Sequence, residues 1–304
     1  MFKGRHPVDI VLLPEPPAQE AVLEATHEAH LVIADKRHQH RIDRRVLENM
    51  RNCLLIQQAA VGFETVDHRA AAEYGIPVAN AAGYNREAVA DWTVMAILNL
   101  IRRGALGDRL MRDGWWGRDR MIGRELGALT VGIVGLGNVG STVARRMGGF
   151  GSRVIYTDPD PTREFDGAGR VGLDQLLEEA DVVCIHTPLD VDTRSLINRE
   201  SLARMRPGAF LVNAARGPIV DEEALVEALQ GGRLGGAALD VYQVEPLSTG
   251  SPLRSLDNVF ISPHIGGATV EAEERLLEVV GDNLLRVLDG QPAENIVNNV
   301  LVRN

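Results

Sequence analysis

The chain has 304 residues, of which 45% are hydrophobic, 24% charged and 4% aromatic. This length predicts about two domains. Asp and Glu total 42 against 32 Lys and Arg, a formal net charge of -10, and so acidic a surface argues against nucleic acid or a membrane as the main partner. The two cysteines, Cys53 and Cys184, are far apart and match no metal-ligand spacing, so we expect reduced thiols, no metal site and a cytoplasmic protein. No apolar run resembles a membrane span or a secretory signal.

The first hundred residues alternate short apolar runs with helical patterns, which predicts a small α/β domain. The expected strands are Asp9–Leu13, Leu31–Ala34, Cys53–Gln57 and Pro77–Ala79. The segment Arg86–Arg103 then shows helical periodicity without Gly or Pro, and predicts one long helix that leads into a second domain.

Residues 104–128 fit neither pattern, because they are rich in Gly and Arg and contain the adjacent Trp115 and Trp116. Tryptophan and arginine are enriched at protein interfaces, so we predict a dimerisation arm and a homodimer. The alternative is a surface loop whose tryptophans pack on their own domain.

From residue 129 to residue 265 short apolar strands alternate with helices, the pattern of βαβ units. The expected strands are Val131–Val134, Val154–Tyr156, Val182–His186, Phe210–Asn213, Ala237–Val241 and Val259–Ser262. The expected helices include Leu173–Ala180, Glu200–Met205 and Glu222–Leu229. Near-continuous apolar strands between charged helices predict a parallel sheet covered on both faces.

A second long amphipathic helix, Val270–Leu288, precedes a short apolar tail. If this helix crosses back, the tail completes the first domain. We therefore predict an α/β fold of two Rossmann-like, doubly wound parallel-sheet domains joined by a hinge of two crossing helices. The first domain would comprise residues 1–100 and 284–304, and the second residues 101–283.

An apolar strand runs straight into the pattern Gly135-x-Gly137-x-x-Gly140. Gly135 permits the tight turn, Gly137 lets the backbone approach a pyrophosphate, and Gly140 lets the next helix pack closely on the strand. The N–H groups near Asn138 and Val139 would face the phosphate charge. This pattern predicts a dinucleotide site, and the alternative is a cluster of helix-capping glycines.

Asp158 ends the next strand, 18 residues beyond Gly140. An acid at about this spacing accepts hydrogen bonds from the adenosine ribose of a dinucleotide. A carboxylate there would repel a 2′-phosphate, which favours NAD over NADP. The alternative is a solvated acid at a strand end.

Three polar residues follow strands in the second half of this domain: Arg216, Glu245 and His264. The carboxyl ends of parallel strands form one edge of a sheet, where ligands bind. Arginine can hold a small carboxylate through two hydrogen bonds, and histidine can exchange the proton of an alcohol. A glutamate beside the histidine favours its protonated form. The three predict a ketone–alcohol oxidoreductase, although each alone could be a capping, turn or strand-end residue.

Several runs resemble the D-isomer-specific 2-hydroxyacid dehydrogenase family. They are HTPL (186–189), LVNAARGPIVDEEAL (211–225), GGAALDVYQVEP (235–246), SPHIGGAT (262–269) and the earlier run at 61–95. The resemblance implies two hinged domains, a substrate domain and an NAD-binding domain, in a dimer. It also implies catalytic roles for Arg216, Glu245 and His264 on a small 2-keto or 2-hydroxy acid.

The resemblance extends to further residues of both domains. It implies that Thr187, Pro188, Ala214, Asp240 and Gly267 line the cofactor site. It places Val61, Gly62, Phe63 and Asn85 around the substrate carboxylate, although the loop at 61–63 could instead be a plain turn.

Departures from the family pattern narrow the substrate class. Glu245 stands where formate-oxidising relatives have glutamine, and Val61 where phosphite-oxidising relatives have lysine. Trp92 stands where many members have histidine, and its role is open. Lys36, Arg37 and His38 could hold a second anionic group or form a solvated charge run.

Two rival functions stay open. One is a phosphoglycerate-type dehydrogenase, although such members often have a regulatory domain beyond the point where this chain ends, at Asn304. The other is an NAD-sensing, corepressor-like binding protein, although this chain shows no disordered extensions that would recruit partners.

Overall fold

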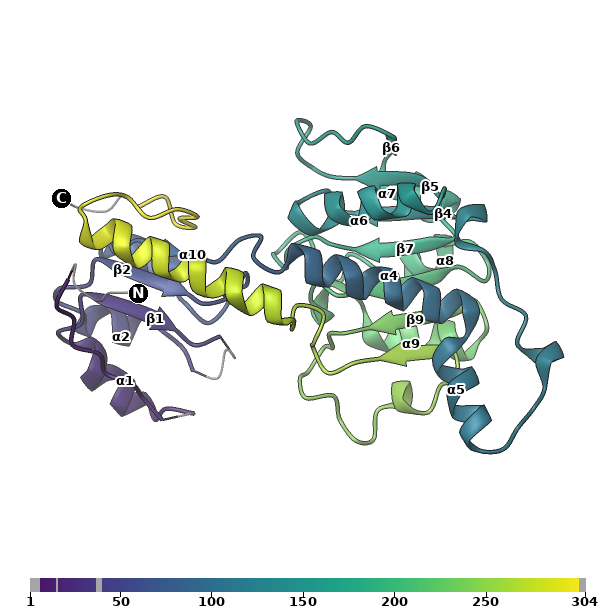
Figure 1. Ribbon diagram of the computed structural model, residues 1–304, viewed down its shortest axis with the longest axis horizontal. Coiled ribbons are helices and arrows are strands. Elements are labelled where there is room, and N and C mark those ends of the chain that lie inside the picture. Colours follow the sequence, from purple (N-terminus) through teal and green to yellow (C-terminus); the bar gives the residue numbers. More distant parts are fainter. Residues whose placement is uncertain (1–5, 15, 37–39, 301–304) are drawn as a thin grey trace. The chain divides into compact units, whose positions relative to one another are not determined.

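The computed structural model describes residues 6–14, 16–36 and 40–300 (Figure 1). The chain divides into two compact units, the first formed by Met1–Asn85 with Thr269–Asn304 and the second by Arg86–Ala268. Each unit is built on a parallel sheet, which confirms the predicted α/β class. The crossing-helix hinge stays a prediction.

The unit boundaries differ from the predicted ones near residues 100 and 284. Those positions fall inside two helices, α4 (Arg86–Arg102) and α10 (Val270–Leu288). Helix α4 packs against helix α6 (Asn138–Gly149) and the sheet of the second unit, whereas α10 packs against strand β2 (Leu55–Gln58) of the first. A helix belongs as a whole to the sheet that its apolar face covers, so neither helix is divided.

The first unit has a three-stranded parallel sheet in the order β1 (Leu31–Ala34), β2, β3 (Val78–Ala79). Helices α1 (Gln19–Thr26), α2 (Arg44–Asn49) and α3 (His68–Glu73) complete it together with α10, which lies beside β2 in Figure 1. Asp43 and Asp67 begin α2 and α3, because each carboxylate accepts a hydrogen bond from a first-turn N–H.

The predicted strand Asp9–Leu13 was wrong. Residues 6–14 form no ladder with any described strand, and Val11 and Leu12 are 70% and 86% exposed. An apolar run becomes a strand only where a neighbour accepts its backbone hydrogen bonds, and the prolines that follow at 14, 16 and 17 cannot donate to a ladder.

The second unit has a seven-stranded sheet in the order β10-β9-β8-β7-β4-β5-β6. The strands are β4 (Thr130–Val134), β5 (Arg153–Thr157), β6 (Ala168–Arg170), β7 (Val182–Ile185), β8 (Phe210–Asn213), β9 (Gly236–Leu239) and β10 (Val259–Ile261). All neighbours pair in parallel. The strand order reverses beside β4, which is the switch point where open α/β sheets bind ligands.

Helices cover both faces of this sheet, as predicted. Helices α4 and α6 share one core cluster with alternate strand residues such as Val182 and Cys184. Helices α7 (Leu173–Glu179), α8 (Arg199–Arg204) and α9 (Glu222–Gln230) share the other with Val183 and Ile185. Successive residues of β7 thus point to opposite faces, which explains why the strands are apolar throughout.

The segment 104–128 contains a helix that the sequence patterns did not predict, α5 (Gly104–Arg112), followed by 3-10 turns at Arg118–Arg120 and Leu126–Ala128. Helix α5 buries none of its residues. Among the described residues, no helix is long and apolar enough to cross a membrane.

Candidate active site

The glycine turn after β4 has the backbone geometry of a dinucleotide cradle. Gly135 has a φ of +94°, and a Cβ there would lie 2.6 Å from the carbonyl oxygen of His186. A Cβ on Gly140 would lie 1.9 Å from the carbonyl oxygen of Gly135. Gly137 is the N-cap residue of α6, and no side chain caps this end of the helix. The N–H groups of the first turn, at Asn138 and Val139, can therefore bind an anion. The turn therefore fits a pyrophosphate.

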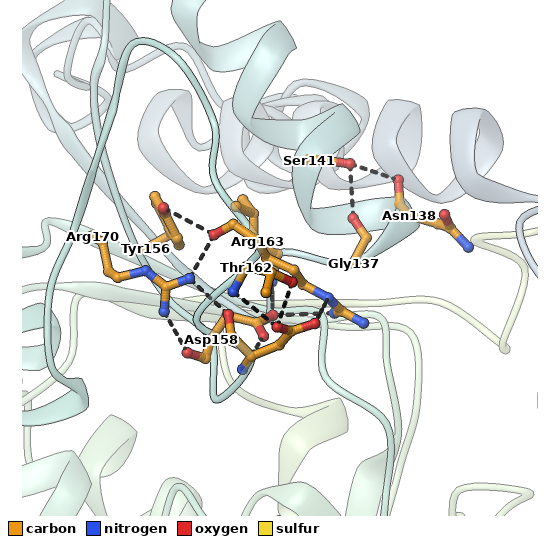
Figure 2. A network of polar contacts seen from close by, with 10 residues as sticks. Gly137, Asn138, Ser141, Tyr156, Asp158, Thr162, Arg163 and Arg170 are labelled. Carbon is orange, nitrogen blue, oxygen red and sulfur yellow. Dashed lines mark hydrogen bonds and ion pairs between the residues drawn. The ribbon is translucent and has the colours of Figure 1, made fainter.

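Asp158 links this turn to the end of β5 (Figure 2). Its Oδ2 accepts a hydrogen bond from the Leu136 N–H at 2.7 Å, and its Oδ1 accepts one from the Asp160 N–H at 2.9 Å. Arg163 places Nη1 3.2 Å from Oδ2, and the same nitrogen would lie 3.3 Å from a Cβ on Gly137. The guanidinium of Arg163 is therefore a positive group beside the turn that the sequence patterns did not identify.

The other predicted cofactor residues also follow strands of the large sheet. Thr187 and Pro188 come after β7, Ala214 after β8, and Gly267 after β10. All of them lie at the carboxyl edge, since every strand runs in the same direction. This is the edge on which the glycine turn lies.

Arg216, Glu245 and His264 follow β8, β9 and β10, which are neighbours in the sheet. His264 Nδ1 lies 2.7 Å from Glu245 Oε2, and Glu245 Oε1 accepts a hydrogen bond from the Tyr242 N–H at 3.1 Å. Both carboxylate oxygens of Glu245 therefore have partners. The pairing holds the imidazole by Nδ1 and leaves Nε2 to exchange a proton.

The electrostatics of the pair favour a charged imidazole. The hydrogen bond that His264 donates to Glu245 raises the pKa of His264 above its ordinary value, burial opposes this, and the negative charge of Glu245 raises it further. Burial also opposes ionisation of Glu245, yet the hydrogen bond and charge of His264 hold the Glu245 pKa below its usual range. The positive charge of Arg216 lowers both pKa values.

A second histidine at the same edge is unsuited to acid–base work. Desolvation of the partly buried imidazole lowers the pKa of His186 to about 4, and its Nε2 has no hydrogen-bond partner among the described residues. His186 is therefore neutral near pH 7, and His264 is the histidine placed to exchange protons.

Local contacts fix the backbone at Arg216 and at His264. Asn213 donates to the carbonyl of Arg216 at 3.0 Å and accepts from the Ala215 N–H at 3.0 Å. Gly217 packs so closely that a Cβ would lie 1.9 Å from the Tyr242 carbonyl. His264 has a φ of +55°, a conformation that costs a non-glycine residue about 1–3 kcal/mol and persists only where surrounding contacts impose it.

Asp240 makes its contacts within the protein. It is 1% exposed; its Oδ1 accepts hydrogen bonds from Ser262 Oγ at 2.6 Å and the Ile265 N–H at 2.8 Å, and its Oδ2 from the Gly266 N–H at 2.6 Å. The cofactor contact implied by the resemblance stays a prediction, and the observed role of Asp240 is to hold the loop of His264.

The predicted substrate residues lie in the first unit, beyond the carboxyl ends of its strands. The loop at 61–63 follows β2; the Val61 carbonyl accepts a hydrogen bond from Asn80 at 2.7 Å, and Phe63 packs edge-on against His68. Asn85 directly precedes α4.

The charged run after β1 is described only in part. Lys36 forms an ion pair with Glu273 of α10, whereas Arg37 and His38 lie outside the described residues. No group of His, Cys, Asp or Glu side chains suited to a metal ion occurs in the described part of the chain.

Sequence reasoning missed the residues that support this site: Arg163, Asn213, Tyr242 and Ser262. Two signals were available. Asn213 directly ends a strand, and Ser262 lies two residues before His264. No local pattern marks Arg163 or Tyr242, although each has a partner nearby in the sequence, Asp158 for Arg163 and Glu245 for Tyr242.

Comparison with known proteins identifies the family. Residues 94–266 match the model of the D-isomer specific 2-hydroxyacid dehydrogenase, NAD binding domain. The chain belongs to this family. This confirms the predicted family, the NAD cofactor and an oxidoreductase that acts on 2-hydroxy acids.

Relatives of this family match nearly the whole chain. A glyoxylate reductase of Thermofilum pendens is 38% identical over 304 residues, covering 95% of this chain and 87% of the relative. A D-3-phosphoglycerate dehydrogenase of Archaeoglobus fulgidus is 37% identical over 86% of this chain but only 50% of its own length. The structure of D-lactate dehydrogenase from Aquifex aeolicus with NAD and lactic acid is 30% identical, with a TM-score of 0.80, covering 91% of this chain and 89% of that one.

Proposed function

We propose that this dehydrogenase interconverts a small, unphosphorylated 2-keto acid of the glyoxylate class and the matching 2-hydroxy acid, in the D form where that acid is chiral. The observation that supports this most is the pair of His264 and Glu245, 2.7 Å apart, beside Arg216 at the edge that also holds the glycine turn. The relative named glyoxylate reductase supports the substrate class.

Each residue of the trio has one task in this proposal. NAD, when bound, supplies the group that accepts or donates hydride. Arg216 binds the substrate carboxylate and polarises the carbonyl. His264 gives its Nε2 proton to the carbonyl oxygen during reduction and takes it back during oxidation, while Glu245 holds the imidazole and stabilises its charge.

The cofactor and substrate contacts follow from the predicted residues. The pyrophosphate would be bound by Gly135, Gly137, Asn138, Val139 and Gly140, and the adenosine ribose by Asp158. The rest of the cofactor would be lined by Thr187, Pro188, Ala214, Asp240 and Gly267. Val61, Gly62, Phe63 and Asn85 would contact the substrate carboxylate. Each follows a strand or precedes a helix at a carboxyl edge, which supports this assignment.

A panel of 2-keto acids with NADH tests the proposal. We expect glyoxylate, pyruvate or hydroxypyruvate to be reduced with a kcat of roughly 1 per second or faster. NADPH is run beside NADH, since Asp158 opposes a 2′-phosphate whereas Arg163 would attract one. Preference for a phosphorylated keto acid would support the phosphoglycerate-type alternative. No turnover, together with an association state that changes with NADH, would support the corepressor-like one.

We further propose that the protein is a cytoplasmic homodimer that uses residues 104–128 as an arm. Trp116 and Ile122 are 84% and 80% exposed, and Met111 is 52% exposed, so the arm presents apolar side chains that a partner subunit would cover. Cys53 and Cys184 are free thiols, consistent with a reducing compartment.

The arm predicts an oligomeric state that can be measured. Sedimentation should give twice the chain mass of 33.1 kDa, and Trp116→Ser with Ile122→Ser should shift the protein toward the monomer. The matched control is Val191→Ser, a residue 88% exposed outside the arm. A wild-type monomer, or a dimer that the arm variant leaves unchanged, contradicts the proposal.

A further inference from the structure

Trp92 is a buried residue of α4 that no step of the proposed chemistry uses. It is 6% exposed, and its ring packs against Phe260, with centroids 6.2 Å apart. Its indole N–H donates a hydrogen bond to Ser262 Oγ at 3.1 Å. Ser262 lies two residues before His264, so this bond joins α4 to the loop that holds the proposed catalytic histidine.

The hydroxyl of Ser262 connects the indole to Asp240 through a second hydrogen bond. A hydroxyl has one proton, and Ser262 Oγ uses it toward Asp240 Oδ1 at 2.6 Å while accepting the indole N–H. The directions of the two bonds are therefore set: indole to hydroxyl, hydroxyl to carboxylate. All three side chains are at least nine-tenths buried, where a donor that loses its partner is costly.

Asp240 in turn holds the backbone on both sides of His264. Its carbonyl oxygen accepts the His264 N–H at 2.9 Å, and its carboxylate accepts the N–H groups of Ile265 and Gly266. A Cβ on Gly266 would lie 2.8 Å from Asp240 Oδ2 and 3.6 Å from Trp92 Cγ. The loop thus packs against both the carboxylate and the indole, and these contacts maintain the positive φ of His264.

We infer that Trp92 is a positioning residue, which acts through Ser262 and Asp240 to orient the imidazole of His264. This inference rests on the proposed function, because it assigns the loop of His264 to catalysis. It concerns the hydrogen bond of the indole N–H, and the bulk of the ring has a separate packing role against Phe260.

Trp92→Phe tests the inference, because phenylalanine keeps an aromatic ring and removes the N–H. We expect kcat to fall about tenfold with the KM for NADH nearly unchanged, less than the roughly 100-fold that a 1 Å misplacement can cost. The control is Phe260→Leu, which alters the packing of the ring and leaves the hydrogen bond, and should retain most of kcat. An unchanged kcat in Trp92→Phe, or an equal loss in Phe260→Leu, overturns the inference.

A double-mutant cycle separates the hydrogen bond from general packing. In a Ser262→Ala background the indole N–H has lost its acceptor, so Trp92→Phe should cause no further loss of kcat. Losses that multiply in the double variant overturn the inference. Should Trp92→Phe fail to fold, Ser262→Ala alone must lower kcat about tenfold or more, and a wild-type kcat there overturns it.

A measurement of the His264 pKa, which does not require turnover, tests this inference separately from the proposed function. The charged groups that face His264 are Glu245, Arg216 and Asp240, and an imidazole displaced from Glu245 loses the contact that raises its pKa. NMR titration of His264 should therefore give a lower pKa in Trp92→Phe than in wild type. An equal pKa in the two proteins overturns the inference. A wild-type protein that reduces no keto acid overturns the proposed function, but the two pKa values can still be compared.

Discussion

His264→Gln is expected to lower kcat for keto acid reduction by about 10²- to 10⁴-fold, the contribution of a positioned general acid. Glutamine can still accept or donate a hydrogen bond near Glu245, but it cannot supply a proton to the substrate oxygen. The Kd for NADH should stay near the wild-type value, because the glycine turn and Asp158 are contributed by other strands. Steady-state kinetics and fluorescence titration with NADH measure the two quantities.

The matched control is His30→Gln, an exposed histidine of the first unit. It should leave kcat and the Kd for NADH unchanged. Activity in His264→Gln close to that of wild type would show that another group supplies the proton, and the role assigned to His264 would then be wrong.

Glu245→Gln is expected to move the pH dependence of both reaction directions toward lower pH. Reduction requires a protonated imidazole, so its rate falls as pH rises through the pKa of His264. Glu245 raises this pKa, first through its hydrogen bond and then through its charge. With the charge removed the pKa falls, so reduction is lost at a lower pH. Oxidation requires the neutral imidazole and therefore begins at a lower pH.

Profiles of kcat/KM against pH, measured in both directions, check this expectation because they report the pKa values of the free enzyme. Glu222→Gln is the matched control: its carboxylate accepts a hydrogen bond from the Gln243 N–H in the same loop at 3.0 Å. That variant should keep the wild-type profile. An unshifted profile in Glu245→Gln would contradict the assigned electrostatic role.

The predicted elements succeeded where the local pattern alone determines the structure. Leu31–Ala34, Phe210–Asn213 and Val270–Leu288 have the predicted bounds, because a short apolar run and a 3.6-residue apolar period are each visible in one short segment. The glycine turn was predictable for a related reason. Its glycines lie at neighbouring positions, so their spacing can be read from one short segment.

Prediction failed where contacts with residues distant in the sequence determine the structure. The apolar run Asp9–Leu13 resembles a strand but pairs with none of the described strands. Helix α5 lies in a Gly-rich and Arg-rich segment and buries none of its residues. No apolar periodicity in the sequence therefore led us to predict it. The ends of the two units follow from which sheet α4 and α10 cover, and that choice depends on long-range packing.

By itself, the sequence determined that each residue to which we assign the chemistry follows a strand: the glycine turn, Asp158, Arg216, Glu245 and His264. Those assignments need only local spacing and side-chain type. The tertiary structure decided their geometry: the 2.7 Å pair of His264 and Glu245, the positive φ of His264, and the chain of buried hydrogen bonds from Trp92. Trp92 and Ser262 are 170 positions apart. Only folding brings such side chains together, because a hydrogen bond acts over about 3 Å of space whatever the separation along the chain.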